Sequence, residues 1–168
     1  TELAVMTLNR DQNDFNLYFA NPRSTVCKLI LNEKNDRYIS GEMIYSFTFF
    51  DNQFVYLSEK NGYSHIYLYS NGGIQQKQLT EGNYDVLDIL AVDKEKKTLY
   101  YASAEESPMR RTICKVDIVK GNKTKLSAQV GYNIARFSNN GKYFVNTWSN
   151  TTTPALVTMN DGNGRQLR

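Results

Sequence analysis

A repeat with a period of 41 to 49 residues runs through this 168-residue chain and restricts the folds open to it. Leucines that close short polar segments stand at positions 31, 79, 126 and 167, which are 48, 47 and 41 residues apart. Serines close three apolar runs, "FVYLS", "LYYAS" and "FVNTWS", at positions 58, 103 and 149. Segments 8–21 and 57–71 also align, with Leu8, Leu17 and Tyr18 each matched 49 residues later. Such a period indicates an array of similar structural units.

Each period contains the signals of four short strands. A short apolar segment such as "YSFTFF" is followed by a polar turn, an aromatic strand, a polar loop, another strand, a Gly/Asn turn and a last short strand. Asn-Gly, Asp-Gly and Gly-Asn pairs supply the positive φ that tight hairpins require. Four short strands in 40 to 50 residues are typical of one blade of a β-propeller.

The apolar pattern within the strands supports stacked blades. In "FVYLS", residues 54–58, both faces of the strand carry bulky side chains. A strand with one wet face would alternate between apolar and polar, whereas a blade between two neighbours is buried on both sides. We therefore predict an all-β fold, a partial β-propeller of about three and three-quarter four-stranded blades. The expected units are approximately 1–36, 37–85, 86–132 and 133–168, and the first lacks its opening strand.

Composition argues against several classes of function. The formal net charge is only +3, and the densest basic cluster, Lys94, Lys96 and Lys97, is interrupted by Glu95. A nucleic-acid-binding protein is expected to carry a clustered basic stripe, so we predict no nucleic-acid partner. No stretch approaches the length of a membrane span. With one histidine, two cysteines and no Cys-x-x-Cys motif, the chain offers no metal site, and we predict no metal and no cofactor.

The one neighbouring serine and histidine, Ser64 and His65, invite comparison with a nucleophile and its base. The nucleophile elbow Gly-x-Ser-x-Gly needs a second glycine, but Ile66 stands there and the following residues are strand-like. Adjacent side chains on a strand also point to opposite faces. We therefore predict no catalytic residue in this chain, a hairpin turn at Gly62, and a partly buried imidazole beside tyrosines.

Two cysteines remain, Cys27 and Cys114. They are expected in strands two blades apart, beyond the Cα separation that a disulfide allows. Both are predicted to be packed thiols. Trp148, in the second strand of the last unit, is predicted to serve packing rather than to be a stacking platform.

Several motifs in order resemble one known family. "LNRDQN" (8–13), "LYFANP" (17–22), "SEKNGYSHIYLYS" (58–70), "LTEGNYDV" (79–86) and "SPMRRTICKVD" (107–117) are similar to the N-terminal propeller of dipeptidyl peptidase IV-type proteins, of the prolyl oligopeptidase family of serine peptidases, in its bacterial form. The resemblance covers essentially the whole chain. It implies an eight-bladed propeller joined to an α/β-hydrolase domain, which carries the catalytic triad and removes N-terminal X-Pro or X-Ala dipeptides.

The resemblance also implies partners and a location. The expected partners are the parent's α/β-hydrolase domain and a peptide substrate, and the expected location is the periplasm or exterior of a bacterium. The family's amine-binding glutamate pair is expected upstream of residue 1, so Glu105 and Glu106 are interpreted as loop charges that pair with Arg110 or Arg111. The connector 37–46 corresponds to a loop that can border the substrate cavity, which makes Arg37, Tyr38 and Tyr45 the candidate pocket residues.

The alternative function is a propeller-type protein-binding module without peptidase activity, although the Gly-His and Trp-Asp signatures of WD-type blades are missing. A third hypothesis is that the chain itself hydrolyses peptides. We expect no turnover of a peptide substrate by the isolated chain. Blades without neighbours expose faces that neighbours would cover, so we also expect the isolated chain to self-associate or to be marginally stable.

Overall fold

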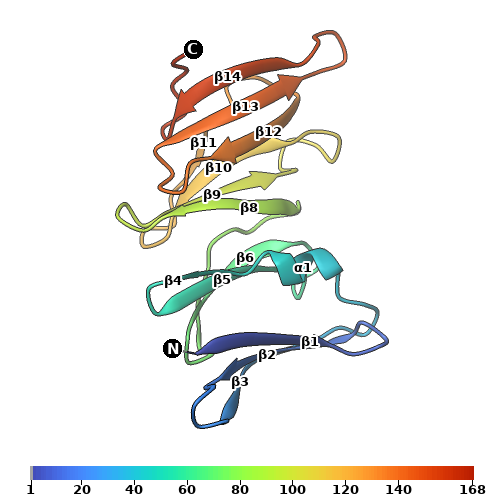
Figure 1. The fold of residues 1–168 in the computed structure, drawn as a ribbon. Helices are drawn as coiled ribbons and strands as arrows, with labels where there is room; N and C mark the ends of the chain where they lie inside the picture. The colour runs from blue at the N-terminus through green and yellow to red at the C-terminus, as the bar shows by residue number, and fades with distance from the viewer. Residues whose placement is uncertain (1) are drawn as a thin grey trace.

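The structure is a computed structural model that describes residues 2–168, and these residues form fourteen strands and one short helix (Figure 1). The strands lie in four antiparallel sheets that follow one another along the chain. The elements of sheets 1 and 2 are β1 (Leu3–Leu8), β2 (Asp14–Ala20), β3 (Cys27–Lys34), α1 (Gly41–Tyr45), β4 (Thr48–Phe50), β5 (Gln53–Ser58), β6 (His65–Ser70) and β7 (Gln75–Gln78). Those of sheets 3 and 4 are β8 (Val86–Asp93), β9 (Thr98–Ser103), β10 (Thr112–Asp117), β11 (Lys123–Lys125), β12 (Tyr132–Phe137), β13 (Tyr143–Ser149) and β14 (Leu156–Asp161).

Each sheet is built from strands that neighbour one another in sequence. Sheet 2 has the order β4-β5-β6-β7 and sheet 3 the order β11-β10-β9-β8, while sheets 1 and 4 have three strands each. Short turns make these hairpins possible. Gly62, at φ 95°, lies in the turn between β5 and β6, in a backbone conformation that L side chains rarely adopt. Figure 1 shows the sheets stacked in succession from the N- to the C-terminus. The predicted partial β-propeller is therefore confirmed.

The central strands bury both of their faces, as the sequence pattern predicts. In β5, Phe54 and Tyr56 pack in a cluster with sheet 1, while Val55 and Leu57 pack in a second cluster with sheet 3. In β9, Leu99 and Tyr101 join that second cluster, and Tyr100 and Ala102 form a third with sheet 4. Successive side chains of a strand point to opposite faces, so each inner strand contributes to two intersheet cores.

Sheet 4 is buried on one face only. Along β12 and β13, buried and exposed residues alternate, in contrast to the continuous burial of β5 and β9. The exposed face nevertheless carries apolar side chains, including Ile134, Val145 and Val157. This face is apolar, as the buried faces between the other sheets are, but within residues 2–168 no further sheet packs against it.

Two local features differ from the sequence-based expectation. Residues 41–45, expected only as part of a connector between blades, form the single turn of α1, and Ser40 caps it by accepting a hydrogen bond from the Glu42 N–H. The fourth strand expected at the end of the last unit is reduced to one bridge between Asn160 and Gln166.

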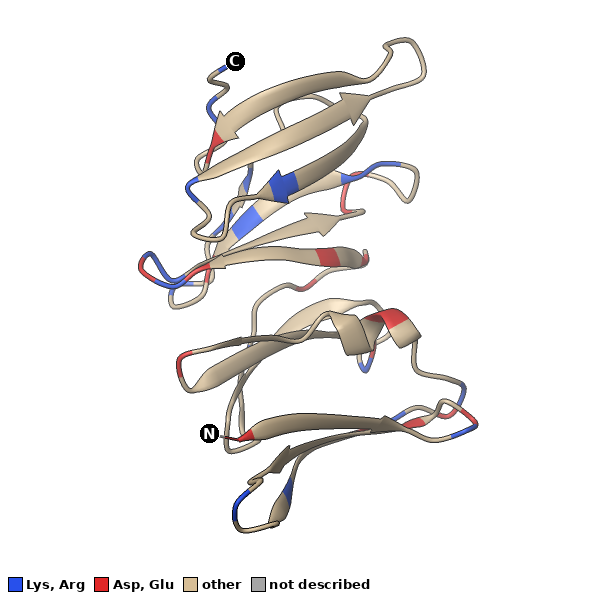
Figure 2. Ribbon diagram, in the orientation of Figure 1, with Lys and Arg blue, Asp and Glu red and all other residues tan. Residues whose placement is uncertain are grey.

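Charged residues lie mainly in loops and at strand ends, and lysines and arginines are spread over several of these loops (Figure 2). Within residues 2–168, no helix is long and apolar enough to cross a bilayer. In the same part of the chain, no group of three or more His, Cys, Asp or Glu residues is arranged to hold a metal ion.

Candidate functional site

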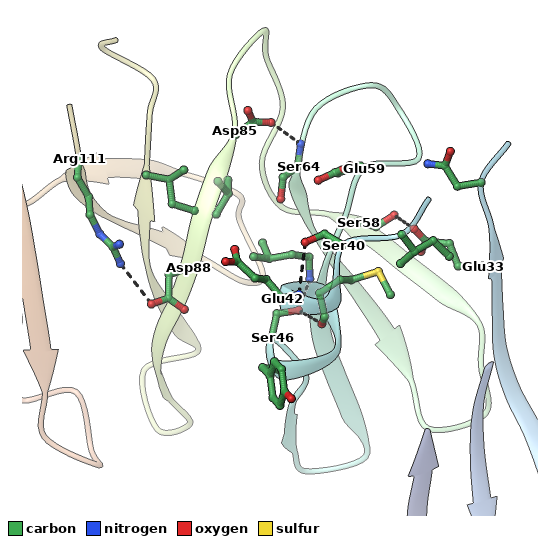
Figure 3. Close-up of a pocket in the computed structure, with 17 residues that line it drawn as sticks. Glu33, Ser40, Glu42, Ser46, Ser58, Glu59, Ser64, Asp85, Asp88 and Arg111 are labelled. Atoms are coloured by element: carbon green, nitrogen blue, oxygen red, sulfur yellow. Dashed lines mark hydrogen bonds and ion pairs between the residues drawn. The ribbon is translucent and has the colours of Figure 1, made fainter. Parts of the chain in front are cut away.

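A cavity of about 500 Å³ opens at the end of the sheets that carries α1 (Figure 3). Its walls come from the end of sheet 1, from α1, and from the facing strand ends of sheets 2 and 3. The charged residues that line it are Glu33, Glu42, Glu59, Asp85, Asp88 and Arg111. Five carboxylates thus face one guanidinium, and the cavity favours positively charged ligands over anions.

Ser46 anchors the helix at the cavity wall. Its hydroxyl donates to the Met43 carbonyl over 2.7 Å and accepts from the Leu57 N–H over 2.9 Å. The buried hydroxyl therefore joins the end of α1 to β5. Tyr45, next to it, is 90% exposed and lines the cavity.

Glu33 is held at the end of β3 by two side chains of sheet 2. The hydroxyls of Tyr56 and Ser58 each donate to the carboxylate over 2.8 Å. Burial, together with the negative charge of Glu33, raises the pKa of Tyr56 far above its ordinary value. Tyr56 therefore stays protonated and acts as a donor that connects sheets 1 and 2.

The sheet 3 side of the cavity is formed by two aspartates with partners. Asp85 accepts a hydrogen bond of 2.8 Å from the Ser64 N–H, which joins the loop before β8 to the β5–β6 hairpin. Asp88 in β8 forms an ion pair of 3.2 Å with Arg111, just before β10. Both contacts are visible in Figure 3. These contacts neutralise or orient part of the acidic lining.

Glu59 lies at the end of β5 among the other carboxylates. Desolvation at the cavity wall raises the pKa of Glu59, and the negative charges of Asp85 and Glu33 raise it further. The folded state therefore holds this proton more tightly than the unfolded chain does. The free energy of unfolding therefore falls as the pH rises from the ordinary pKa of a glutamate to the raised pKa of Glu59. Above that interval the carboxyl is ionised in both states, and the full destabilisation is present.

We therefore expect Glu59→Gln to raise the free energy of unfolding at about pH 7 and to leave it unchanged at about pH 3, where the carboxyl is protonated in both states. Urea denaturation at both pH values measures this difference. Glu42→Gln, which removes a carboxylate from α1 in the same cavity, is the matched control and should show the smaller gain. An equal gain for Glu59→Gln at both pH values would contradict the assignment.

Ser64 and His65 do not form a catalytic pair. The buried His65 ring lies 2.9 Å from the Gly82 carbonyl at Nε2 and 3.2 Å from Thr80 Oγ1 at Nδ1. A carbonyl only accepts, so Nε2 donates to Gly82, while Nδ1 faces the Thr80 hydroxyl, a group that both donates and accepts. The ring meets Tyr84 edge-on with centroids 5.4 Å apart. His65 is thus a structural residue beneath the loop that leads to Asp85.

The three residues predicted to border a substrate pocket are not brought together at the cavity. Tyr45 lines it, whereas Arg37 and Tyr38 lie in the connector outside the lining set. Tyr38 is exposed. A role for any of the three toward substrate stays a prediction.

Two sequence-based expectations need correction. Glu105 pairs with Lys123 over 3.3 Å and Glu106 pairs with Lys125, rather than with Arg110 or Arg111, and both lysines belong to β11. These lysines lie beside the loop because β11 is hydrogen-bonded to β10. Both cysteines are free, as expected, and Cys114 is buried.

Cys27 is exposed rather than packed, because it begins the outermost strand of sheet 1. Trp148 is buried, as predicted, and donates through Nε1 to the Val130 carbonyl.

The acidic lining was missed by sequence reasoning. Glu33, Glu59 and Asp85 stand 26 residues apart and belong to three different sheets or their connectors. Each lies next to a strand end on the same side of the array, so placing strand ends within the repeat would have grouped them. No local motif marks them.

The fold and the position of the cavity define the class of protein first: this is a segment of a β-propeller with a cavity at one end of its blades. Residues 1–155 match the family model "Dipeptidyl peptidase IV (DPP IV) N-terminal region", and the chain belongs to that family.

Similar proteins are known from bacteria and fungi. The crystal structure of Porphyromonas gingivalis dipeptidyl peptidase 4 is 47% identical, with a TM-score of 0.95 over 99% of this chain and 24% of that one. The dipeptidyl peptidases 4 of Trichophyton equinum and Trichophyton rubrum are both 31% identical over 103 residues. Those matches cover 60% of this chain and 13% of each fungal protein. The chain therefore spans a minor part of the proteins it resembles.

Proposed function

We propose that this chain is a non-catalytic propeller segment of a dipeptidyl peptidase IV-like serine peptidase that removes N-terminal X-Pro or X-Ala dipeptides. In the parent, an α/β-hydrolase domain supplies the nucleophile, and the propeller walls the route to it and orients short peptides. The family match over residues 1–155 carries this proposal. We place the parent in the periplasm or outside the cell of a bacterium.

The cavity supports a gating role. Its lining comes from three consecutive sheets, so its shape depends on how the blades are stacked. The carboxylates attract the protonated N-terminus of a peptide, and such a field raises the rate of encounter without forming part of the chemistry. The ring of Tyr45, at the end of α1, is exposed and accessible for contact with a peptide that enters the cavity.

The test uses the native gene product and the chromogenic substrate Gly-Pro p-nitroanilide. We expect the full-length protein to release p-nitroaniline and the 168-residue chain to release none. Ser64→Ala should leave kcat/KM of the full-length protein unchanged, because His65 is engaged by Thr80 and Gly82. Removing two charges with Glu42→Gln and Glu59→Gln should raise KM several-fold at low salt and leave kcat unchanged.

Two results would reject the proposal. Loss of activity in Ser64→Ala would place catalysis in this chain. A native product that lacks a Gly-x-Ser-x-Gly elbow and does not cleave the substrate would favour the protein-binding module instead.

A further inference from the structure

The end of the sheets opposite the acidic cavity carries the opposite charge. Six turns join neighbouring strands there, and they comprise residues 21–26, 51–52, 71–74, 94–97, 118–122 and 138–142. The β4–β5 and β8–β9 turns can be followed at this end, away from α1, in Figure 1. The basic residues of the six turns are Arg23, Lys94, Lys96, Lys97, Lys120 and Lys142, whereas the acidic ones are Asp51 and Glu95. We call the surface of these six turns the basic face.

Most of the positive charge on the basic face is free of partners. All six basic side chains belong to exposed residues. Asp51 is occupied by Lys97, with which it forms an ion pair of 2.6 Å. Within residues 2–168, Lys94, Lys120 and Lys142 form no ion pair. Unpaired lysines at one end of the array create a positive field that attracts anions.

Apolar side chains stand exposed among these charges. Each of the turns that precede the fourth strands of sheets 1, 2 and 3 carries one: Val26 is 62% exposed, and Ile74 and Val119 are each 70% exposed. Turns are normally built from Gly, Asn, Asp, Ser and Pro, so the turn geometry itself does not call for β-branched apolar residues. The same kind of exposed residue in three consecutive sheets indicates a contact surface.

The turns of the basic face form one continuous surface. The ion pair described above joins the β4–β5 turn of sheet 2 to the β8–β9 turn of sheet 3. Lys77 Nζ of β7 donates to the Val119 carbonyl over 2.8 Å, which joins sheet 2 to the β10–β11 turn. The β6–β7 turn lies against sheet 1, because a Cβ on Gly73 would collide with the Ile30 carbonyl of β3. The apolar tips therefore stand in a row, about 10 Å apart from sheet to sheet.

We propose that the basic face docks reversibly on an anionic lipid bilayer. Val26, Ile74 and Val119 enter the boundary between headgroups and acyl chains, while the lysines and Arg23 contact the lipid phosphates. A single weak apolar anchor holds a protein on a membrane only marginally, whereas an apolar anchor combined with a basic patch holds it well. The apolar tips favour a bilayer over a soluble polyanion, because burial of these side chains gains free energy only in an apolar medium.

Docking in this way orients the acidic cavity away from the membrane. β5 and β8 each have one end in the cavity lining and the other end at the basic face. These strands have six and eight residues, which separates the two surfaces by about 20–26 Å. The cavity therefore stays open to solution while the other end is bound. This inference goes beyond the proposed function and does not depend on peptidase activity.

Vesicle flotation of the full-length native protein tests the proposal. With vesicles of phosphatidylcholine that contain about 30% phosphatidylglycerol, we expect the protein to float at about 50 mM NaCl and to stay in solution at about 500 mM, because salt screens the attraction. Lys94→Gln, Lys120→Gln and Lys142→Gln together should lower the partition coefficient about 100-fold. Val26→Ser, Ile74→Ser and Val119→Ser together should lower it at least about tenfold.

The matched control is the double variant Met109→Ser and Arg110→Gln. It makes the same chemical changes at two exposed positions of the loop between β9 and β10, at the cavity end, and should leave flotation unchanged. Thermal unfolding followed by circular dichroism checks that every variant folds. Absence of flotation with anionic vesicles would overturn the proposal, and so would an equal loss in the control. Binding that needs the lysines but not the three apolar tips would assign the face to a soluble polyanion instead of a bilayer.

Discussion

Replacing Phe54 by alanine is expected to lower the free energy of unfolding by about 3–5 kcal/mol. Phe54 is 0% exposed and lies in β5, where its side chain packs in the core between sheets 1 and 2. Its ring lies 5.5 Å from that of Tyr69 and 5.8 Å from that of Phe47, measured between centroids. Because the surrounding rings are held by two hydrogen-bonded sheets, they cannot collapse fully into the space that the phenyl ring leaves.

Phe49→Ala is the matched control for this prediction. Phe49 pairs directly with Phe54 across strands β4 and β5, but its side chain is 39% exposed. Phe49→Ala should lower the free energy of unfolding by less than half as much as Phe54→Ala, because it removes less buried apolar surface. Urea denaturation followed by tyrosine and tryptophan fluorescence measures both variants. Equal losses would show that Phe54 does not occupy a confined intersheet core.

The repeat was predictable from the self-similarity of the sequence along the chain, and the two-sided burial of the inner strands was predictable because it follows from the pattern of neighbouring residues. "FVYLS" alone places Phe54 and Tyr56 on one face and Val55 and Leu57 on the other, and the structure puts these pairs in two different cores. The hairpin at Gly62 was predictable for the same reason, since the turn chemistry is local.

The helix and the exposed cysteine depend on information that is not local. One helical turn over residues 41–45 is too short to produce an apolar periodicity, and its stability relies on Ser46 bonding to β5. Cys27 begins a strand, as the sequence predicts, but its exposure reflects the position of β3 at the edge of sheet 1. Sequence pattern cannot separate an edge strand from a central one.

The candidate site was the least predictable part. Its carboxylates come from three sheets, and they share a cavity only because successive blades present the same ends side by side. The family resemblance predicted that Arg37, Tyr38 and Tyr45 border a substrate pocket. Of these three residues, Tyr45 lines the cavity.

The exposed face of sheet 4 leads to the second large expected effect, which is self-association of the isolated chain (Figure 1). Val157 on β14 is 68% exposed, and Ile134, Val145 and Met159 on the same face are exposed as well. Equivalent strands in sheets 2 and 3 are buried on both faces, so this face has the apolar character that an adjoining sheet would cover. A second copy of the chain supplies such a surface, and sedimentation velocity should show association that increases with concentration.

Charges on this face should reverse the association. Val145→Lys together with Val157→Lys removes two apolar contacts and buries two ammonium groups on docking, so the dissociation constant should rise at least about tenfold. The control pair, Thr124→Lys and Asn139→Lys, adds the same charge at exposed positions outside this face and should change it little. A compact monomer at every concentration would show that the face is stable in water without a partner. Association unaffected by the valine changes would place the contact elsewhere, on the outer face of sheet 1, whose exposed apolar residues include Leu3 and Leu29.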